Sequence, residues 1–370
     1  MCQNGCRSLS HLNWRKNLSK NKKSFITKRW GIVSVVGILI LLGVLLPLPY
    51  YVEMPGTTEN VVEMIKVDQA PLSKKSEKGS LNLTTVSMMR ATGASLIYAA
   101  LTDFTDVYSK EDMMGNQSDA DYTRMNAFYM ASAQNAAIYE AFKLAGKPFD
   151  LEYKGVYVLD VMKESTFKDV LHIADTVTGV NGQSFKSSEE LMTYIKSQKI
   201  GAKISVQYLD ESGASKSADG KTIKISDGKA GIGITLVDHT AIKSRPEVTI
   251  DAGSIGGPSA GMMFTLEIYA QLTGQDLTRG REIAGTGTIE KDGKIGRIGG
   301  IDKKIATASR NGAKIFLAPD DEITKEMKKA EPDVKSNYQE ALAAAKKLNT
   351  KMKIVPVKTV QDAINYLEKS

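Results

Sequence analysis

Cysteine is almost absent from this 370-residue sequence, since Cys2 and Cys6 are the only two. Everything after Cys6 must therefore hold together by packing, without disulfide bonds. Two cysteines supply half of a zinc site, and no H-E-x-x-H motif occurs, so we expect no metal centre. A phosphate-binding G-x-x-x-x-G-K-[ST] loop is also missing, because the nearest stretch, residues 215–222, lacks the first glycine. We expect no cofactor.

Acidic residues are absent from residues 1–30, which carry eight lysines and arginines. The formal net charge of the whole chain is +7, so +7 minus 8 leaves about −1 for all the other residues. The basic character belongs to this tail alone, and the remaining chain offers no support for binding nucleic acid. We therefore expect no nucleic-acid partner.

Charged residues are missing from the next 22 residues, 31–52, which are mostly apolar. A helix of that length spans a hydrocarbon core of roughly 30 Å. A secretory signal peptide is the alternative, but its apolar region has only about 7–15 residues and ends at a small-residue cleavage site. The sequence "PLPYYVEMPG" offers no such site. We predict an uncleaved transmembrane helix over 31–52 in the cell membrane, with the basic tail cytoplasmic and the later residues extracellular.

The middle of the chain alternates between helical and strand-like patterns. Apolar residues at helical spacing predict a helix over 122–145, which Gly146 and Pro148 end. Residues 150–228 instead contain short strands, a turn at Asn181-Gly182 and a helix that starts at Ser187 with a capping box. This order of elements resembles a PDZ domain of the type found in bacterial proteases.

The resemblance to a PDZ domain implies a site for an extended peptide, which adds its backbone to an open strand edge. A structural insert without a ligand is the alternative. In the peptide-binding interpretation, the carboxylate-binding loop and the strand beside the groove are formed by Gly155, Val156, Tyr157 and Val158.

The stretch "SIGGPSAGM", residues 254–262, places Ser259 on a constrained turn before a predicted helix. A serine hydroxyl needs a nearby base to become a nucleophile. Histidine is the usual base, but only three occur: His11 lies in the tail, His172 belongs to the PDZ-like segment, and His239 has no obvious orienting carboxylate. A lysine can replace histidine if burial lowers its pKa.

The predicted helix within residues 299–312 offers two lysines. At about 100° per residue, Lys304 falls on the apolar face with Ile301 and Ile305. Lys303 falls on the opposite face, where we expect it to be in water. The periodicity therefore favours Lys304 as the base.

Four motifs follow one another over residues 256–319: "GGPSAG", "AGTGTI", "GKIGRIGGIDKK" and "GAKIFLAP". In this order and near this spacing they resemble the proteolytic domain of Lon proteases. The resemblance implies that Ser259 is the nucleophile and Lys304 the general base. It also implies that Thr286 helps to position the lysine amine. Gly257 would leave room for the substrate backbone to come close.

Together the two resemblances imply an α+β fold in which a PDZ-like domain is inserted into a Lon-type proteolytic domain. The expected domains are a basic cytoplasmic tail at 1–30, a transmembrane helix at 31–52, the first part of the Lon-like region at 53–149, the PDZ-like domain at 150–228 and the Lon-like Ser-Lys proteolytic domain at 229–370.

This combination resembles the membrane-anchored PDZ–Lon proteases of Gram-positive bacteria. The resemblance implies an ATP-independent serine endopeptidase outside the cytoplasm, which processes exposed peptides or unfolded protein segments because it has no unfolding motor. Lon domains form rings, so a homo-oligomer is compatible with the fold. Two alternatives stay open: a membrane-tethered peptide-binding module whose Lon-like domain is inactive, and an esterase or amidase that uses His239.

Overall fold

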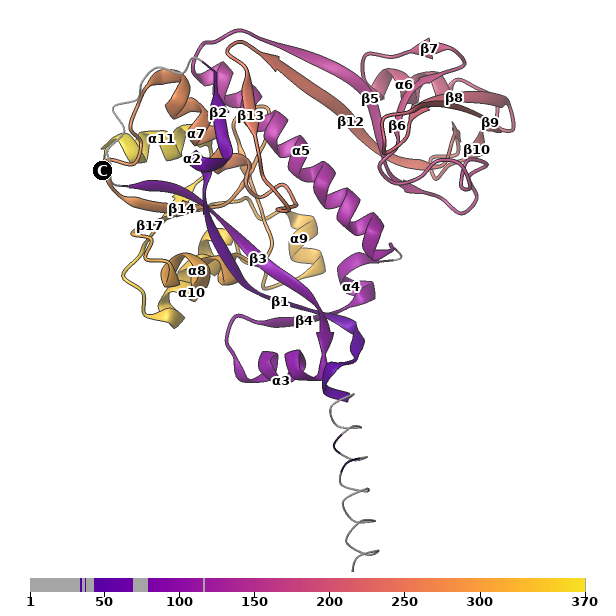
Figure 1. The fold of residues 1–370 in the computed structure, drawn as a ribbon. Helices are drawn as coiled ribbons and strands as arrows, with labels where there is room; N and C mark the ends of the chain where they lie inside the picture. Colours follow the sequence, from indigo (N-terminus) through magenta and orange to yellow (C-terminus); the bar gives the residue numbers. More distant parts are fainter. Residues whose placement is uncertain (1–33, 35–36, 38–42, 69–78, 116, 370) are drawn as a thin grey trace, which may run out of the picture. The chain divides into compact units, whose positions relative to one another are not determined.

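The structure is a computed structural model, and its described residues form two compact units (Figure 1). The smaller unit comprises Met1–Glu53 and Met88–Met113, and the larger comprises Met54–Ser87 and Met114–Ser370. The residues described are 34, 37, 43–68, 79–115 and 117–369.

Ten of the 22 residues of the predicted transmembrane segment, 31–52, lie outside the described residues. Among the residues that are described, no helix is both long and apolar enough to cross a membrane. The last six residues of the segment belong to strand β1 (Pro47–Asn60), in which Tyr51 and Val52 are buried. A membrane-spanning helix that includes these six residues is therefore wrong, and the apolar run available for a span ends at Leu46.

The smaller unit is built around a strand pair and a short helix. Strand β1 pairs antiparallel with β4 (Asp106–Ser109), with Tyr50 opposite Ser109. Strand β3 (Ser80–Thr92) leads directly into helix α3 (Gly93–Leu101), and a second helix, α4 (Lys110–Met114), follows β4. A capping box between Thr92 and Ser95 fixes the start of α3, because each residue's hydroxyl accepts a hydrogen bond from the other's backbone N–H.

The main sheet of the larger unit has the strand order β18-β17-β14-β3-β1, and β3, β14, β17 and β18 run parallel. Its later strands are β14 (Glu282–Gly285), β17 (Ile315–Pro319) and β18 (Lys353–Val357). All five residues of β17 are buried. This is expected of a central parallel strand with both faces covered.

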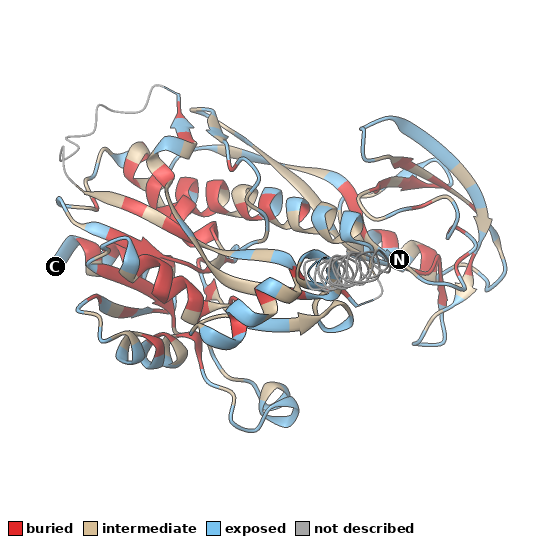
Figure 2. Ribbon diagram, turned by 60° about the horizontal axis from the view of Figure 1, so that its bottom comes forward, coloured by how far each residue is buried: buried red, intermediate tan, exposed pale blue. Residues whose placement is uncertain are grey.

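Seven helices of the described chain accompany this sheet. The predicted helix over 122–145 is confirmed as α5, which begins after the cap Ser118, and it packs against α7. Helix α7 directly follows the Ser259 turn and is buried along nearly its whole length (Figure 2). The helices are α2 (Val61–Met64), α5 (Asp119–Leu144), α7 (Gly261–Thr273), α8 (Ile301–Arg310), α9 (Lys325–Ala330), α10 (Asn337–Leu348) and α11 (Val360–Lys369).

Residues between α5 and the Ser259 turn form a second sheet with the order β12-β5-β6-β8-β9. It has its own apolar core, which includes Val156, Phe167 and Leu191. Helix α6 (Ser188–Lys196) starts at the predicted cap Ser187, whose side chain accepts from Glu190 N–H. The strands are β5 (Phe149–Val161), β6 (Thr176–Val180), β7 (Gln183–Ser184), β8 (Lys203–Leu209), β9 (Ser215–Lys221) and β12 (Ile234–Ser244).

Three two-stranded ladders complete the described structure. The ladder of β15 and β16 matters for the site because it follows Gly287 directly. The pairs are β2 (Ile65–Val67) with β13 (Val248–Ile250), β10 (Ile223–Lys224) with β11 (Ala230–Gly231), and β15 (Thr288–Ile289) with β16 (Ile295–Gly296). The architecture is mixed α+β, as predicted.

Candidate active site

The turn that carries Ser259 is held from two sides. Gly257 has a φ of 84° and its N–H donates to Asn126 O of α5 at 2.9 Å, so glycine is needed here for the backbone conformation. On the other side, the carbonyl oxygen of Ser259 accepts from Gly287 N–H at 2.9 Å and from the Thr286 hydroxyl at 3.1 Å. The half-buried Ser259 is thereby fixed just before α7 begins.

Lys304 comes from α8 and reaches the serine from a buried position, with only 3% of the residue exposed. Its Nζ lies 2.8 Å from Ser259 Oγ and 2.9 Å from Thr286 Oγ1. The fold therefore brings together Ser259, Thr286 and Lys304, three residues that the sequence predicted to act together. A buried amine at hydrogen-bond distance from a serine hydroxyl is the geometry that base-assisted attack requires.

Lys303 departs from the sequence prediction. We expected it in water, but it is 2% exposed, and its Nζ lies 3.3 Å from Asp302 Oδ1. Helical periodicity alone gave the wrong answer because helix α10 packs on α8 and covers a face that would otherwise meet solvent. Burial therefore does not distinguish the two lysines, whereas the distance of Lys304 to Ser259 does.

A cavity of about 340 Å³ opens over Ser259. Its walls come from distant parts of the chain: β1 supplies Thr57 and Glu59, β3 supplies residues 84–86, and α5 supplies Met130. The loop before the serine and Lys304 complete the lining. No local sequence pattern identified Thr57, Glu59 or Met130 as cavity residues, because they meet Ser259 only in the folded chain.

Backbone donors are available beside the serine. The N–H groups of Ser259 and Ala260 form no hydrogen bond with any described residue, and both residues line the cavity. They lie immediately before α7, whose positive dipole end faces the same turn. Such N–H groups can stabilise an oxyanion that forms next to Ser259.

Neither described histidine belongs to this cavity. The Nδ1 atom of His239 lies 2.9 Å from Thr176 Oγ1, and its ring packs edge-on against Phe128 and Tyr157. His172 is largely exposed, with its ring near Asp175. The structure therefore gives no support to an esterase or amidase that uses His239 as the base.

The four residues predicted to border a peptide groove, Gly155–Val158, have no open edge. On one side β5 pairs with β12, where Val156 lies opposite Asp238, and on the other side Val156 and Tyr157 pair with β6. A Cβ at Gly155 would collide with Val177 O of the neighbouring strand β6, so the close packing of the two strands requires glycine here. The prediction that these residues receive a peptide strand is wrong, because a segment about 80 residues later, β12, occupies that edge.

The open edge belongs to β12, which is the outer strand of this sheet and pairs on its far side with no described strand. Helix α6 lies beside it, and Ser188 N–H donates to Asp238 Oδ1 at 2.9 Å. The glycine-and-apolar pattern of residues 155–158 recurs in Gly231–Ile234, directly before this edge. That repeat is the signal in the sequence that could have identified it.

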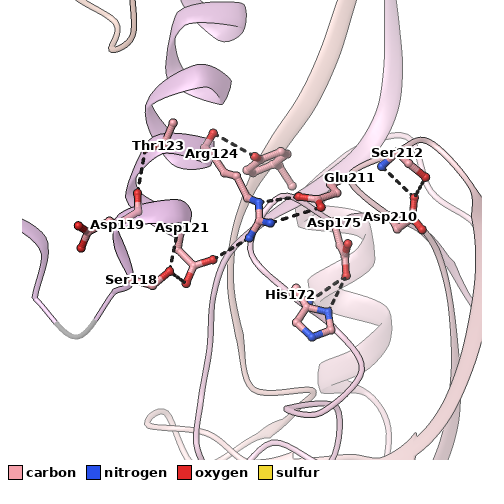
Figure 3. Close-up of polar contacts among 11 residues, drawn as sticks. Ser118, Asp119, Asp121, Thr123, Arg124, His172, Asp175, Asp210, Glu211 and Ser212 are labelled. Atoms are coloured by element: carbon pink, nitrogen blue, oxygen red, sulfur yellow. Dashed lines mark hydrogen bonds and ion pairs between the residues drawn. The ribbon is translucent and has the colours of Figure 1, made fainter.

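Helix α5 contacts both the second sheet and the serine turn. The Phe128 ring stacks on Tyr157 of β5 with a centroid distance of 3.6 Å, and Arg124 pairs with Glu211 (Figure 3). Within the same stretch of α5, the carbonyl of Asn126 holds Gly257, and Met130 lines the cavity. One short helical segment therefore touches both sites.

Comparisons with known proteins agree with this division. A model of the Lon protease (S16) C-terminal proteolytic domain matches residues 237–367, and a model of the PDZ domain matches residues 144–226. The chain contains a PDZ domain and a Lon-type proteolytic domain. These matches support a serine protease with a peptide-binding domain. The PDZ match covers β5 to β9 of the second sheet, whereas β12 follows that match and lies mostly in the Lon-type match.

Curated proteins similar to this chain include several named Lon protease. The chain is 30% identical over 115 residues to the Lon protease of Neorickettsia sennetsu, which covers 31% of this chain and 12% of that protein. It is 32% identical over 99 residues to the Lon protease of Citrifermentans bemidjiense, which covers 26% and 12%. The aligned region therefore spans only 12% of the length of these relatives.

Among solved structures, the PDZ domain of an SdrC-like protein of Listeria monocytogenes is 41% identical and covers 23% of this chain and 90% of its own, with a TM-score of 0.22. The PDZ domain of the SdrC-like protein of Listeria innocua is 37% identical and covers 23% and 96%, also with a TM-score of 0.22.

The position of His239 between α5 and β5 gives a testable pH dependence. Burial, and secondarily the charge of Lys154, lower the pKa of His239 below its ordinary value of about 6.5. The unfolded chain then binds the proton more readily than the fold. The stabilising contribution is fully present above about pH 6.5 and is lost as the pH falls toward the lowered pKa.

We expect the free energy of unfolding of the wild type to fall between pH 7 and pH 5, and to fall less steeply in a His239→Gln variant. Chemical denaturation followed by circular dichroism measures this difference. Equal slopes for wild type and His239→Gln would contradict the prediction.

Proposed function

We propose that this chain is a membrane-anchored, ATP-independent serine endopeptidase that uses Ser259 and Lys304 as a catalytic dyad. The observation that supports it most directly is the 2.8 Å separation of Lys304 Nζ and Ser259 Oγ at the wall of a cavity. The proposed substrates are peptides and unfolded protein segments outside the cytoplasm.

The proposed reaction starts when Ser259 Oγ attacks the scissile carbonyl and Lys304 accepts the hydroxyl proton. This step needs a neutral amine, and burial of Lys304 disfavours the charged form. The N–H groups of Ser259 and Ala260 stabilise the resulting oxyanion. Lys304 then donates the proton to the leaving amine as the C–N bond breaks, and an acyl-enzyme on Ser259 remains.

Water completes the reaction by attacking the acyl-enzyme while Lys304 again accepts a proton. Thr286 holds the amine throughout, because its hydroxyl lies 2.9 Å from Lys304 Nζ and also donates to Ser259 O. The three residues thus share one hydrogen-bonded group, in which nucleophile, base and positioning residue depend on one another.

The location outside the cytoplasm is proposed from the sequence. The apolar run that ends at Leu46 follows a tail with eight basic and no acidic residues, which favours a cytoplasmic tail and an exported body. The phosphate-binding loop of the ATP-driven motor of Lon proteases does not occur in this sequence, as expected of an enzyme that works in a compartment without ATP. Only flexible segments can then reach Ser259.

The PDZ domain is proposed to bind such segments at the open edge of β12, between Ile234 and Asp238. An extended peptide would add its backbone to this edge, with α6 on its other side. The contact of α5 with both β5 and the serine turn supports a coupling between the proposed peptide site and Ser259.

The proposed activity is tested with secreted peptides. Full-length protein is incubated with peptides from culture supernatant, and mass spectrometry compares the products of wild type and Ser259→Ala. We expect new peptide termini with wild type and none with the variant, because the nucleophile is missing. The matched control is Ser217→Ala, which removes a hydroxyl from the exposed face of β9, outside the cavity, and should leave the products unchanged. Identical products from wild type and Ser259→Ala would favour an inactive peptide-binding module instead.

A further inference from the structure

Helix α3 turns an apolar face outward. The residue spacing of this face follows one side of a helix, at i, i+3, i+4 and i+7. Ile97 is 58% exposed, Tyr98 48% and Leu101 81%, whereas Ser95 and Ala99 of the opposite face are buried. A helix that faces water shows the reverse pattern. The outward face consists of Ala94, Ile97, Tyr98 and Leu101.

The apolar exposure continues around α3 within the smaller unit. Eight of the thirteen large hydrophobic residues that are exposed in the described chain belong to this unit, although it is the smaller of the two. Helix α3 itself contains no charged residue. Such a concentration of exposed apolar side chains indicates a binding surface. The residues outside α3 are Leu45, Leu46, Tyr50, Met89 and Val107.

The face begins where the apolar run of the N-terminus ends. A Cβ on Gly93, the first residue of α3, would lie 2.6 Å from Gly43 O and 3.1 Å from Val44 Cα. The chain therefore needs glycine here, because the two backbones touch. Arg90 also donates from Nε to Leu48 O at 3.3 Å, just before α3. The start of α3 is thus fixed against Gly43 and Val44 of the run and against Leu48 of β1.

The length of the run argues for lipid as the occupant of this face. The uncharged residues 31–46 would form a helix of about 24 Å, which is shorter than a hydrocarbon core of roughly 30 Å. A span of that length places its outer end, and α3 beside it, at or just below the headgroup level. Tyr50 and Tyr98 are of the residue type that prefers this level.

We propose that α3 is an interfacial helix whose outward face inserts into the outer leaflet of the bilayer. The proposal rests on the membrane anchor of the proposed function. Its partner is the boundary between headgroups and acyl chains, and the absence of charge on α3 means that zwitterionic lipid suffices. A second copy of this chain is the competing occupant, and the experiment separates the two.

The experiment uses the full chain in vesicles of phosphatidylcholine with or without bromine on the acyl chains. Trp14 and Trp30 are replaced by Phe, and a single tryptophan is introduced as Ile97→Trp or Leu101→Trp. We expect brominated lipid to quench both by at least about twofold, because both side chains insert. The matched control is Leu342→Trp on α10, an exposed apolar position of the larger unit, which should not be quenched.

A variant that keeps only Trp30 reports on the anchor itself. If Trp30 is quenched and both α3 positions are not, the interfacial helix is refuted while the anchor stands. If Trp30 is not quenched, the anchor fails, and the α3 proposal fails with it. The remaining outcome is that Ile97→Trp and Leu101→Trp are shielded from an aqueous quencher but insensitive to bromine, while the chain cross-links as a dimer. A second copy would then cover this face, and the proposal would be overturned.

Discussion

A Lys304→Met variant is expected to lose about 10⁴-fold in kcat, with little change in KM. Methionine is close to lysine in length and fills the same buried space, but it cannot accept the Ser259 proton. Lys304 lies 2.8 Å from Ser259 Oγ, and no other described basic side chain lies within hydrogen-bond distance of that atom. Steady-state hydrolysis of a defined peptide that the wild type cleaves measures the loss.

Three further variants identify the cause of that loss. Lys304→Arg should be equally inactive, because a guanidinium stays protonated and cannot act as the base. A Ser259→Ala, Lys304→Met double variant should be no slower than either single variant, since nucleophile and base act as a unit. Lys325→Met on the exposed surface of α9 is the control and should keep full activity. Full hydrolysis by Lys304→Met would refute the dyad.

The local parts of the candidate site could be predicted from the sequence. The glycines around Ser259, and the apolar periodicity around Lys304, identified the turn and the helix that carry the two residues. Ser259 and Lys304 are 45 residues apart in the chain, and no local pattern predicts that they meet. Only the resemblance to Lon proteases predicted that they act together, and the structure places Lys304 Nζ 2.8 Å from Ser259 Oγ.

The failures share one physical cause. Lys303 was expected in water because the periodicity of α8 describes that helix alone. It carries no information about α10, which lies 30 to 40 residues later in the chain and packs on α8. Gly155–Val158 were expected to offer an open edge because the sequence around β5 does not show that β12 pairs with it. Burial and strand pairing are properties of the whole fold, so segments that pack from a distance override a local pattern.

Helix α5 shows when a local pattern is sufficient. Its periodicity and the stop signals Gly146 and Pro148 predicted a helix over 122–145, and the structure has it at Asp119–Leu144. What the pattern could not provide is the role of the helix. Asn126 and Met130 are ordinary helical residues in the sequence, and they acquire meaning only because the serine turn and its cavity pack against them.

Thr286→Val is expected to lower kcat about 10- to 100-fold, because valine has the shape of threonine but leaves the buried Lys304 amine without one partner. An unmade buried hydrogen bond costs about 1–3 kcal/mol, which corresponds to that range of rates. The same substitution removes the hydrogen bond from the Thr286 hydroxyl to Ser259 O. Thr286→Ser keeps both contacts and should retain most of the activity.

The pH profile separates positioning from a merely structural effect. An acceptor beside an amine favours its protonated form, so losing the Thr286 hydroxyl makes the neutral amine easier to reach. The acidic limb of the kcat profile should therefore move to lower pH in Thr286→Val even though the maximal rate falls. A general loosening of the fold would reduce the rate without moving this limb. Equal rates and equal pH profiles for wild type and Thr286→Val would contradict this role of Thr286. Lys304 would then hold its position through the α8 backbone and its packing alone.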